Sequence, residues 1–305
     1  MFRSPREFRT LLAPAAAAVV IFGSSGLAYA SGVQVSLASS FNADNVLRYS
    51  GSFTTPTISY DNSTPGGSVD NWLVTQSAAN QLATSQGLTN PAPVGINDNG
   101  LYPASGPRLY DVQLGFTNTT PTGTNTVIRS SASGNFTFSV PNNMYSQFAI
   151  FGSGGSGNST LTITLNYTTG SPGVLTGVTL PDWYSGNPSS TAASAAGTYF
   201  ALTPAMARQA AYRFPSSGYQ VPDAPGGAYI YGVNLAPDPT RVLASVQVAY
   251  VPSSPGYTVA NFFTAAGAVA TAAPPSTPVP GTLLLGLMGL SLVCWFYISR
   301  RRAAH

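Results

Sequence analysis

The sequence predicts an all-β protein whose central region forms an antiparallel sandwich or barrel. Apolar and polar residues alternate along many short segments, which is the period of a half-buried strand. Clusters of Gly, Pro and Asn separate these segments and mark turns. Aromatic residues make up 11% of the chain and charged residues only 7%, a balance that favours a packed domain over a disordered one.

The clearest strand pattern lies at residues 160–167, which read TLTITLNY. Here Leu161, Ile163 and Leu165 fall on one face, and the intervening polar residues fall on the other. We expect Val246 and Val248 to join these three residues in the core. Further strands are predicted at residues 33–38, 109–116, 135–140, 146–151, 174–180, 228–235, 241–251 and 257–263.

Few segments favour a helix. Residues 205–214 are expected to be helical, because Thr203 can cap them and Pro204 suits the first turn. Residues 70–86 are a second candidate. Residues 152–158, GSGGSGN, read as a flexible loop, because no Lys follows the glycines as a phosphate-binding loop would require.

The N-terminus has the features of a secretory signal peptide over residues 1–30. Arginines at positions 3, 6 and 9 precede an apolar stretch at 11–22, and Ala28 and Ala30 fit the small-residue cleavage rule. Cleavage after Ala30 would leave Ser31 as the new N-terminus, outside the cytoplasm.

The C-terminus predicts a membrane anchor at 281–305. The uncharged residues 282–299 would span about 27 Å as a helix, close to the roughly 30 Å hydrocarbon core of a bilayer. Arg300, Arg301 and Arg302 follow and favour the cytoplasmic side. The region at 31–264 is then the exported domain, and the Ala- and Pro-rich residues 265–280 form a linker that carries the sorting motif.

This tail resembles the PEP-CTERM sorting signal. The paired prolines Pro278 and Pro280, the apolar helix and the arginine cluster match it, whereas Val279 stands where the usual signal has Glu. The resemblance implies retention in the inner membrane of a Gram-negative bacterium that makes exopolysaccharide. It also implies removal of the tail by an exosortase-type membrane protease, with release to the cell surface or the extracellular space. The alternative is a permanent single-pass anchor.

The exported region has a looser resemblance to galactose-binding-like jelly rolls. Residues 97–104, NDNGLYPA, are followed by a hydrophobic strand, a Phe-rich strand, a Tyr-Thr-Thr-Gly segment, Asp182-Trp183, and last strands around 241–243. The resemblance covers about residues 95–265. It implies an antiparallel β-sandwich of jelly-roll type.

Composition excludes several kinds of chemistry from the exported region. It contains no His, Cys, Glu or Lys, which rules out a Ser-His-Asp triad, a Cys-His pair, a His-based zinc site and a Lys Schiff base. We therefore predict no catalytic residues, no metal and no cofactor. Six arginines against eight aspartates give a net charge of about −2, so nucleic acid is not an expected partner. The eight aspartates could still supply a pair of carboxylates, so an Asp-dependent glycoside hydrolase remains an alternative.

Two further features concern ligands. The Asn97–Gly100 turn offers oxygen atoms that could hold calcium, although a turn that caps itself is the alternative. Trp72, Trp183 and Tyr184 are candidates for stacking on sugar rings, and packing in the core is the alternative for each. The sequence thus predicts an exported, non-enzymatic cell-surface or matrix protein associated with exopolysaccharide; a carbohydrate-binding module with a defined glycan is the alternative.

Overall fold

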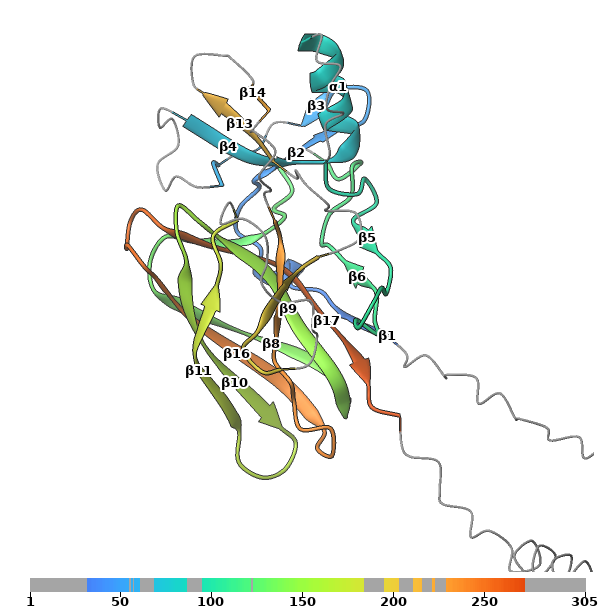
Figure 1. The fold of residues 1–305 in the computed structure, drawn as a ribbon, viewed down its shortest axis with the longest axis vertical. Helices are drawn as coiled ribbons and strands as arrows, with labels where there is room; N and C mark the ends of the chain where they lie inside the picture. The colour runs from blue at the N-terminus through green and yellow to red at the C-terminus, as the bar shows by residue number, and fades with distance from the viewer. Residues whose placement is uncertain are drawn as a thin grey trace, which may run out of the picture.

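The computed structural model describes residues 32–54, 56, 58–60, 69–86, 95–121, 123–183, 195–202, 211–215, 221–222 and 229–271. This part of the chain is mostly β, with antiparallel sheets packed together as in a β-sandwich. The prediction of an antiparallel β fold is confirmed at this level. The two largest sheets lie in the lower part of Figure 1.

The first large sheet contains six strands. Its order is β1 (Gly32–Val35), β17 (Val259–Val269), β9 (Tyr145–Gly155), β15 (Tyr231–Asn234) and β12 (Tyr199–Ala201), and β7 (Ile128–Ser130) also pairs with β17. All of these pairs are antiparallel. Because Gly32 of β1 lies opposite Ala268 of β17, the first and last strands described here lie side by side.

The second large sheet contains four strands, and again every neighbour is antiparallel. Its order is β11 (Gly173–Leu180), β10 (Ser159–Tyr167), β16 (Leu243–Pro252) and β8 (Gly134–Asn143). The pattern that predicted β10 also explains it. Leu161, Ile163 and Leu165 point into the protein, and the threonines between them point outward.

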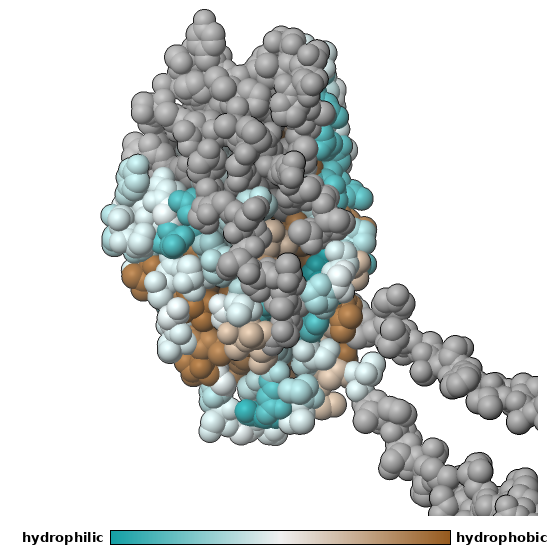
Figure 2. Space-filling view, in the orientation of Figure 1, coloured by the Kyte–Doolittle hydropathy of each residue, from teal (hydrophilic) through white to brown (hydrophobic). Residues whose placement is uncertain are grey.

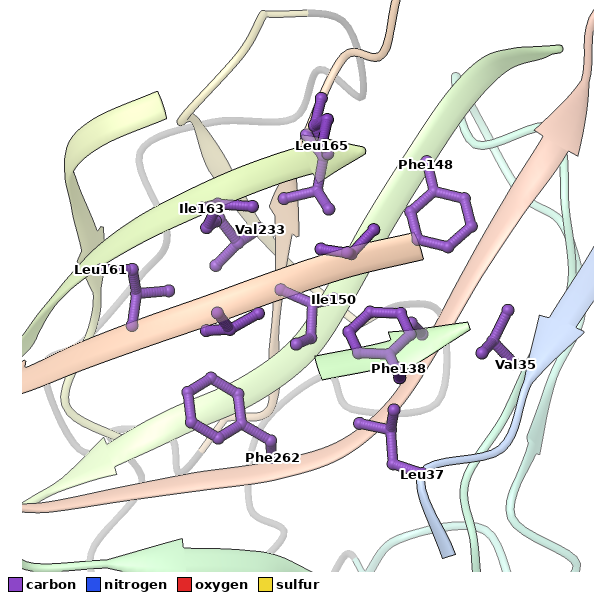
Figure 3. Packing of buried hydrophobic residues seen from close by; sticks show 14 of the residues in the cluster. Val35, Leu37, Phe138, Phe148, Ile150, Leu161, Ile163, Leu165, Val233 and Phe262 are labelled. Atoms are coloured by element: carbon purple, nitrogen blue, oxygen red, sulfur yellow. The ribbon is translucent and has the colours of Figure 1, made fainter. Parts of the chain in front are cut away.

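The main core lies between these two sheets. Side chains from β8 and β10, among them Phe138 and Ile163, face side chains from β9, β15 and β17, among them Ile150, Val233 and Phe262 (Figure 3). The five residues predicted for the core are confirmed there, each at most 2% exposed: Leu161, Ile163, Leu165, Val246 and Val248. At about 25 cal/mol per Å² of apolar surface, this burial is the main driving force of the fold.

A smaller region lies above the two large sheets in Figure 1. Its five-stranded sheet has the order β14 (Val221–Pro222), β13 (Ala211–Pro215), β4 (Val69–Val74), β2 (Val46–Tyr49) and β3 (Phe53–Thr54). The pair β2–β4 is parallel. Helix α1 (Gln76–Gln86) follows β4, the short pair β5 (Leu101–Tyr102) and β6 (Val112–Gln113) lies beside the large sheets, and a 3-10 turn covers Ala38–Ser40.

A buried ion pair ties this smaller region to the loop before β7. The two terminal guanidinium nitrogens of Arg48 donate to the two carboxylate oxygens of Asp44 at 2.8 Å, and neither side chain is exposed. Arg48 Nε also donates to the Thr120 carbonyl oxygen at 3.2 Å. Thr126 Oγ1 donates to Asp44 at 3.1 Å, so the charges are enclosed by polar partners as buried charges require.

The helix predictions had opposite outcomes. Within residues 70–86 the structure has a helix at Gln76–Gln86, whereas Asp70–Val74 belongs to β4. The prediction of a helix at 205–214 was wrong for the residues that the structure describes. Ala211–Pro215 forms β13 and pairs with β4, with Ala211 opposite Leu73. Strand pairing over a long sequence separation has overridden the local helical signal there.

Two small-residue segments are strands rather than loop or linker. The loop prediction for 152–158 was wrong for its first part, since β9 continues to Gly155. A side chain at Gly152 would overlap the Asn261 carbonyl oxygen of β17, so glycine allows these strands to lie close. Likewise β17 continues to Val269, into the segment assigned to the linker, and Ala265, Ala266 and Ala268 are fully buried.

Candidate binding site

A pocket of about 520 Å³ opens where β1 meets the β5–β6 pair. Its polar lining consists of Gln34, Asp111 and Gln113. The rest of the lining is supplied by Gly32, Leu101, Ala104, Leu109 and Tyr110. Leu109 is 43% exposed and presents apolar surface at this site.

Hydrogen bonds hold the polar lining in place. Gln34 Nε2 donates to the Asp111 carbonyl oxygen, and the Gln113 backbone N–H donates to Gln34 Oε1 at 2.9 Å. Gln113 Nε2 donates to the Asn99 carbonyl oxygen at 2.8 Å. The Ala104 backbone N–H donates to Asp111 Oδ1 at 2.7 Å. These bonds leave Asp111 Oδ2 and Gln113 Oε1 as acceptors without a partner among the described residues.

Neighbouring elements support the rim of the pocket. The Gln147 side chain on β9 accepts from the Leu109 N–H at 2.9 Å and donates to the Pro107 carbonyl oxygen at 2.8 Å. Arg108 lies in the connection between β5 and β6. Its side chain is 3% exposed and donates to the carbonyl oxygens of Tyr102 and Pro103 at 3.2 and 2.6 Å. Burial lowers the pKa of this guanidinium from its ordinary value. The connection between β5 and β6 is therefore held to β9 by Gln147 and closed internally by Arg108.

Tyr110 contributes to the core under the pocket. Its ring is 1% exposed and meets Phe151 edge-on, with the ring centroids 6.5 Å apart. Burial raises the pKa of the Tyr110 phenol above its ordinary range, and that of the Tyr102 phenol as well. Both phenols thus stay neutral even above pH 10, and Asp111 is the single acidic residue among those that line the pocket.

The three aromatic residues predicted to contact sugars do not form one surface. Trp183 is 1% exposed and packs against Tyr60, with ring centroids 5.1 Å apart, so a sugar cannot reach its ring in this structure. Trp72 is half-buried on β4 and packs against the small cluster around Leu47 and Val74. Tyr184 lies outside the described residues.

The turn at Asn97–Gly100, considered for calcium, caps helix α1. Asp98 Oδ1 accepts the Ser77 backbone N–H at 2.8 Å, and Asp98 Oδ2 accepts the Ser77 hydroxyl at 2.5 Å. A carboxylate at this position also suits the positive end of the helix dipole. Both carboxylate oxygens thus hold the helix to the turn.

Other aspartates also have structural partners. Asp44 is paired with Arg48, and Asp238 accepts from the backbone and hydroxyl of Thr240 at 2.9 and 2.7 Å. The Thr240 hydroxyl bond chiefly lowers the pKa of Asp238. Within the described ranges, no group of three or more His, Cys, Asp and Glu side chains could hold a metal ion.

The residues predicted for export and sorting lie outside the part of the chain that the structure describes. They are Ala28, Ala30, Pro278, Val279, Pro280, Arg300, Arg301 and Arg302. Among the described residues, no helix combines the length and apolarity needed to cross a bilayer. The span predicted at 282–299 is not among them.

The face of the molecule seen in Figure 2 mixes apolar and weakly polar surface in its lower part. Figure 2 shows pale, weakly polar residues and brown apolar patches interspersed over much of the lower part of the molecule. Serine and threonine give this pale colour because their hydropathy is close to neutral. Such a surface offers hydrogen bonds with little net charge.

Comparisons with known protein families, with curated proteins and with solved structures found no match.

Sequence reasoning missed the pocket. Gln34 and Gln113 are 79 positions apart in the chain and meet only because β1 runs beside the β5–β6 pair. The signal available in the sequence was the polar position of each residue in an alternating segment: Gln34 between Val33 and Val35, and Gln113 between Val112 and Leu114. That signal marks a residue as outward-facing and does not say which other residues lie beside it.

Proposed function

We propose that the protein is an exported, non-enzymatic component of the cell surface or extracellular matrix that associates with exopolysaccharide. The observation that carries the proposal is the composition of the pocket beside β1. It combines one carboxylate, two fixed amides and apolar surface, which are groups that hold hydroxylated ligands. Glycoside hydrolysis requires two carboxyl groups on either side of the bond, and Asp111 is the single acid in this lining.

The proposed fold for this role is a jelly roll. In support, the chain crosses repeatedly from one large sheet to the other. The strand order is β7, β17, β9, β15 in the first sheet and β8, β16, β10, β11 in the second. Two interlocking Greek keys give this order of eight strands, an architecture that lectins use among other proteins.

The proposed route to the surface rests on the two ends of the sequence. The signal peptide would be removed after Ala30, and the helix at 282–299 would hold the domain outside the inner membrane until an exosortase-type protease acts near Pro278–Pro280. Terminal peptide mass spectrometry of the mature surface protein checks this. Intact peptides from Leu283 onward would instead indicate a permanent anchor.

Binding and hydrolysis are separated by one experiment. The full-length protein, in detergent where the tail is retained, is mixed with exopolysaccharide from a producing strain, and both sedimented protein and new reducing ends are measured. We expect co-sedimentation without new reducing ends. The Asp111→Asn variant keeps the Ala104 hydrogen bond and removes the charge, so we expect weaker co-sedimentation; reducing ends from the wild type that this variant abolishes would establish the hydrolase alternative.

A carbohydrate-binding module with one defined glycan is favoured by the same pocket. A fixed pocket discriminates between sugars, whereas a matrix component tolerates many. Retention of the protein on one purified oligosaccharide and on no other would support the module.

A further inference from the structure

We infer that the outer face of the four-stranded sheet is a second glycan-contacting surface, suited to a neutral, extended polysaccharide chain. This outer face consists of the side chains that β8, β10, β11 and β16 turn away from the core, and its central row is Thr160, Thr162 and Thr164 of β10. It involves none of the residues that line the pocket. The inference rests on the proposed association with polysaccharide and names the class of polymer.

The outer face is open to solvent and built from short polar side chains. Thr160 and Thr162 are exposed, as are Thr137 on β8 and Gln247 on β16. One row of polar side chains crosses three strands, because Thr164 lies opposite Gln247, which in turn lies opposite Thr137. Thr162 and Thr160 lie opposite Ala249 and Val251, so the face is an array of polar groups with apolar positions between them.

The hydrogen-bonding groups of this array are available. Within the part of the chain that the structure describes, the side chains of Thr160, Thr162 and Gln247 have no protein partner. One bond within the face joins Asn166 Nδ2 to Ser245 Oγ at 3.2 Å. The pocket differs, because most of its amide groups are already bonded to the protein. A ligand on the outer face therefore meets more unused donors and acceptors than a ligand in the pocket.

The absence of charged residues from these four strands favours a neutral occupant. None of the four strands contains a charged residue. An anionic polymer would gain no Coulomb attraction there and would lose hydration, whereas a neutral polysaccharide exchanges hydrogen bonds with water for similar ones with the protein. Val174 and Val251, at 56% and 53% exposed, add apolar surface for the carbon-bound hydrogens of sugar rings.

The geometry fits an extended chain. Neighbouring strands lie about 4.8 Å apart, which is close to the length of one sugar residue in an extended polysaccharide. A chain that runs across the strands along the row of Thr164, Gln247 and Thr137 would therefore meet one polar group on each of three successive strands. Such repetition gives weak contacts that add along the chain.

A second copy of this protein fits the same sheet less well. Protein interfaces are enriched in aromatic residues and Arg at their centre, and this face presents short hydroxyl side chains there. Edge pairing is hindered on one side by the bulge opposite Leu161–Ile163, where Gly177 has φ +67°, and on the other by Pro141 within β8. We therefore assign the face to the polysaccharide.

The test uses three polymers and three variants of the full-length protein. Microcrystalline cellulose represents a neutral extended chain, alginate an anionic one, and the exopolysaccharide of a producing strain the natural matrix. The double variant Thr162→Val/Thr164→Val removes two hydroxyl groups and keeps their shape. Thr124→Val is the matched control, because Thr124 is an exposed threonine outside the four strands. Asp111→Asn reports on the pocket.

We expect the wild type to co-sediment with cellulose and not with alginate. The amount bound to cellulose should change little when the salt concentration is raised. The double variant should bind cellulose roughly tenfold more weakly, the usual effect of losing two neutral hydrogen bonds, while its melting temperature and the binding of the Thr124 control stay at wild-type values. Unchanged binding by the double variant, or a preference for alginate, would overturn the inference and leave the proposed function standing. Failure of the wild type to bind any of the three polymers would overturn both.

Discussion

Replacing Trp183 by Ala tests whether this residue belongs to the core or to a sugar-binding surface. The structure places it in the core: the side chain is 1% exposed, and its ring lies 5.1 Å from that of Tyr60, which in turn stacks on Phe263 at 6.3 Å. The backbone on either side is also fixed, because the Trp183 N–H donates to the Gly154 carbonyl oxygen and its own carbonyl accepts from Tyr229, both at 2.8 Å. The site therefore has little freedom to collapse around a truncated side chain.

The expected cost follows from that rigidity. Truncating a buried Trp or Phe to Ala lowers the free energy of unfolding by about 3–5 kcal/mol, because the transfer energy is lost and a cavity remains. A protein of this size loses roughly 2–4 °C of melting temperature per kcal/mol, so the midpoint should fall by about 6–20 °C. Trp183→Phe keeps an aromatic ring against Tyr60 and should cost less than half as much.

Thermal unfolding followed by circular dichroism measures these shifts on the full-length protein, next to exopolysaccharide binding at a temperature where each variant is folded. Tyr257 supplies the matched control: it is an aromatic residue at 65% exposure, and Tyr257→Ala should stay within about 0.5 kcal/mol of the wild type. An unchanged midpoint for Trp183→Ala together with lost glycan binding would refute the core assignment, since only an exposed ring gives that pair of results.

Three further predictions concern an ion pair, a helix cap and two buried phenols. Asp44→Ala should lower the free energy of unfolding by about 3–5 kcal/mol because it leaves Arg48 buried and unpaired, whereas replacing both residues by Leu should cost less than the two single changes together; an additive double-mutant cycle in urea would contradict the pairing. Asp98→Ala should cost about 1 kcal/mol through loss of the cap on helix α1, and calcium should not raise the wild-type melting temperature, since both Asp98 oxygens already accept from Ser77. Tyr102 and Tyr110 should remain neutral when exposed tyrosines ionise at about pH 10, because burial raises their pKa values in the folded protein. The stability that the two phenols contribute is therefore complete below that pH and is lost as the pH rises further. Ultraviolet titration showing all phenols ionising together in the folded protein would count against this prediction.

The sequence predicted the main core well because that part of the fold follows from local pattern. Period-two alternation alone identified Leu161, Ile163 and Leu165, and the structure buries all three. The same holds for segments that form little regular strand. Residues 109–116 contain only the two-residue strand β6, yet Tyr110, Val112, Leu114 and Phe116 are all buried as the alternation required.

Small residues hid the ends of β9 and β17, where the predicted strands stopped short. Gly152–Gly155 and Ala265–Ala268 lack the large apolar side chains that make alternation visible, and Gly and Ala are poor strand formers on their own. Their small side chains let β9 and β17 pair closely, since a larger residue at Gly152 or Gly267 would meet the backbone of the neighbouring strand. The information that decides these strands lies in the partner strand, far away in the chain.

The two candidate sites, the pocket and the outer face, also differ in how far local sequence predicts them. No local pattern could have brought Gln34 to Gln113, because their contact depends on β1 lying beside the β5–β6 pair. The outer face, by contrast, follows directly from residues 160–167. The alternation that sends Leu161, Ile163 and Leu165 inward also sends the threonines outward, so one segment specifies a core and a uniform polar surface together. Threonine at these positions also favours the strand through its β-branched side chain. The Thr162→Val/Thr164→Val variant separates the two roles, because valine keeps the β-branched shape and removes only the hydroxyl groups.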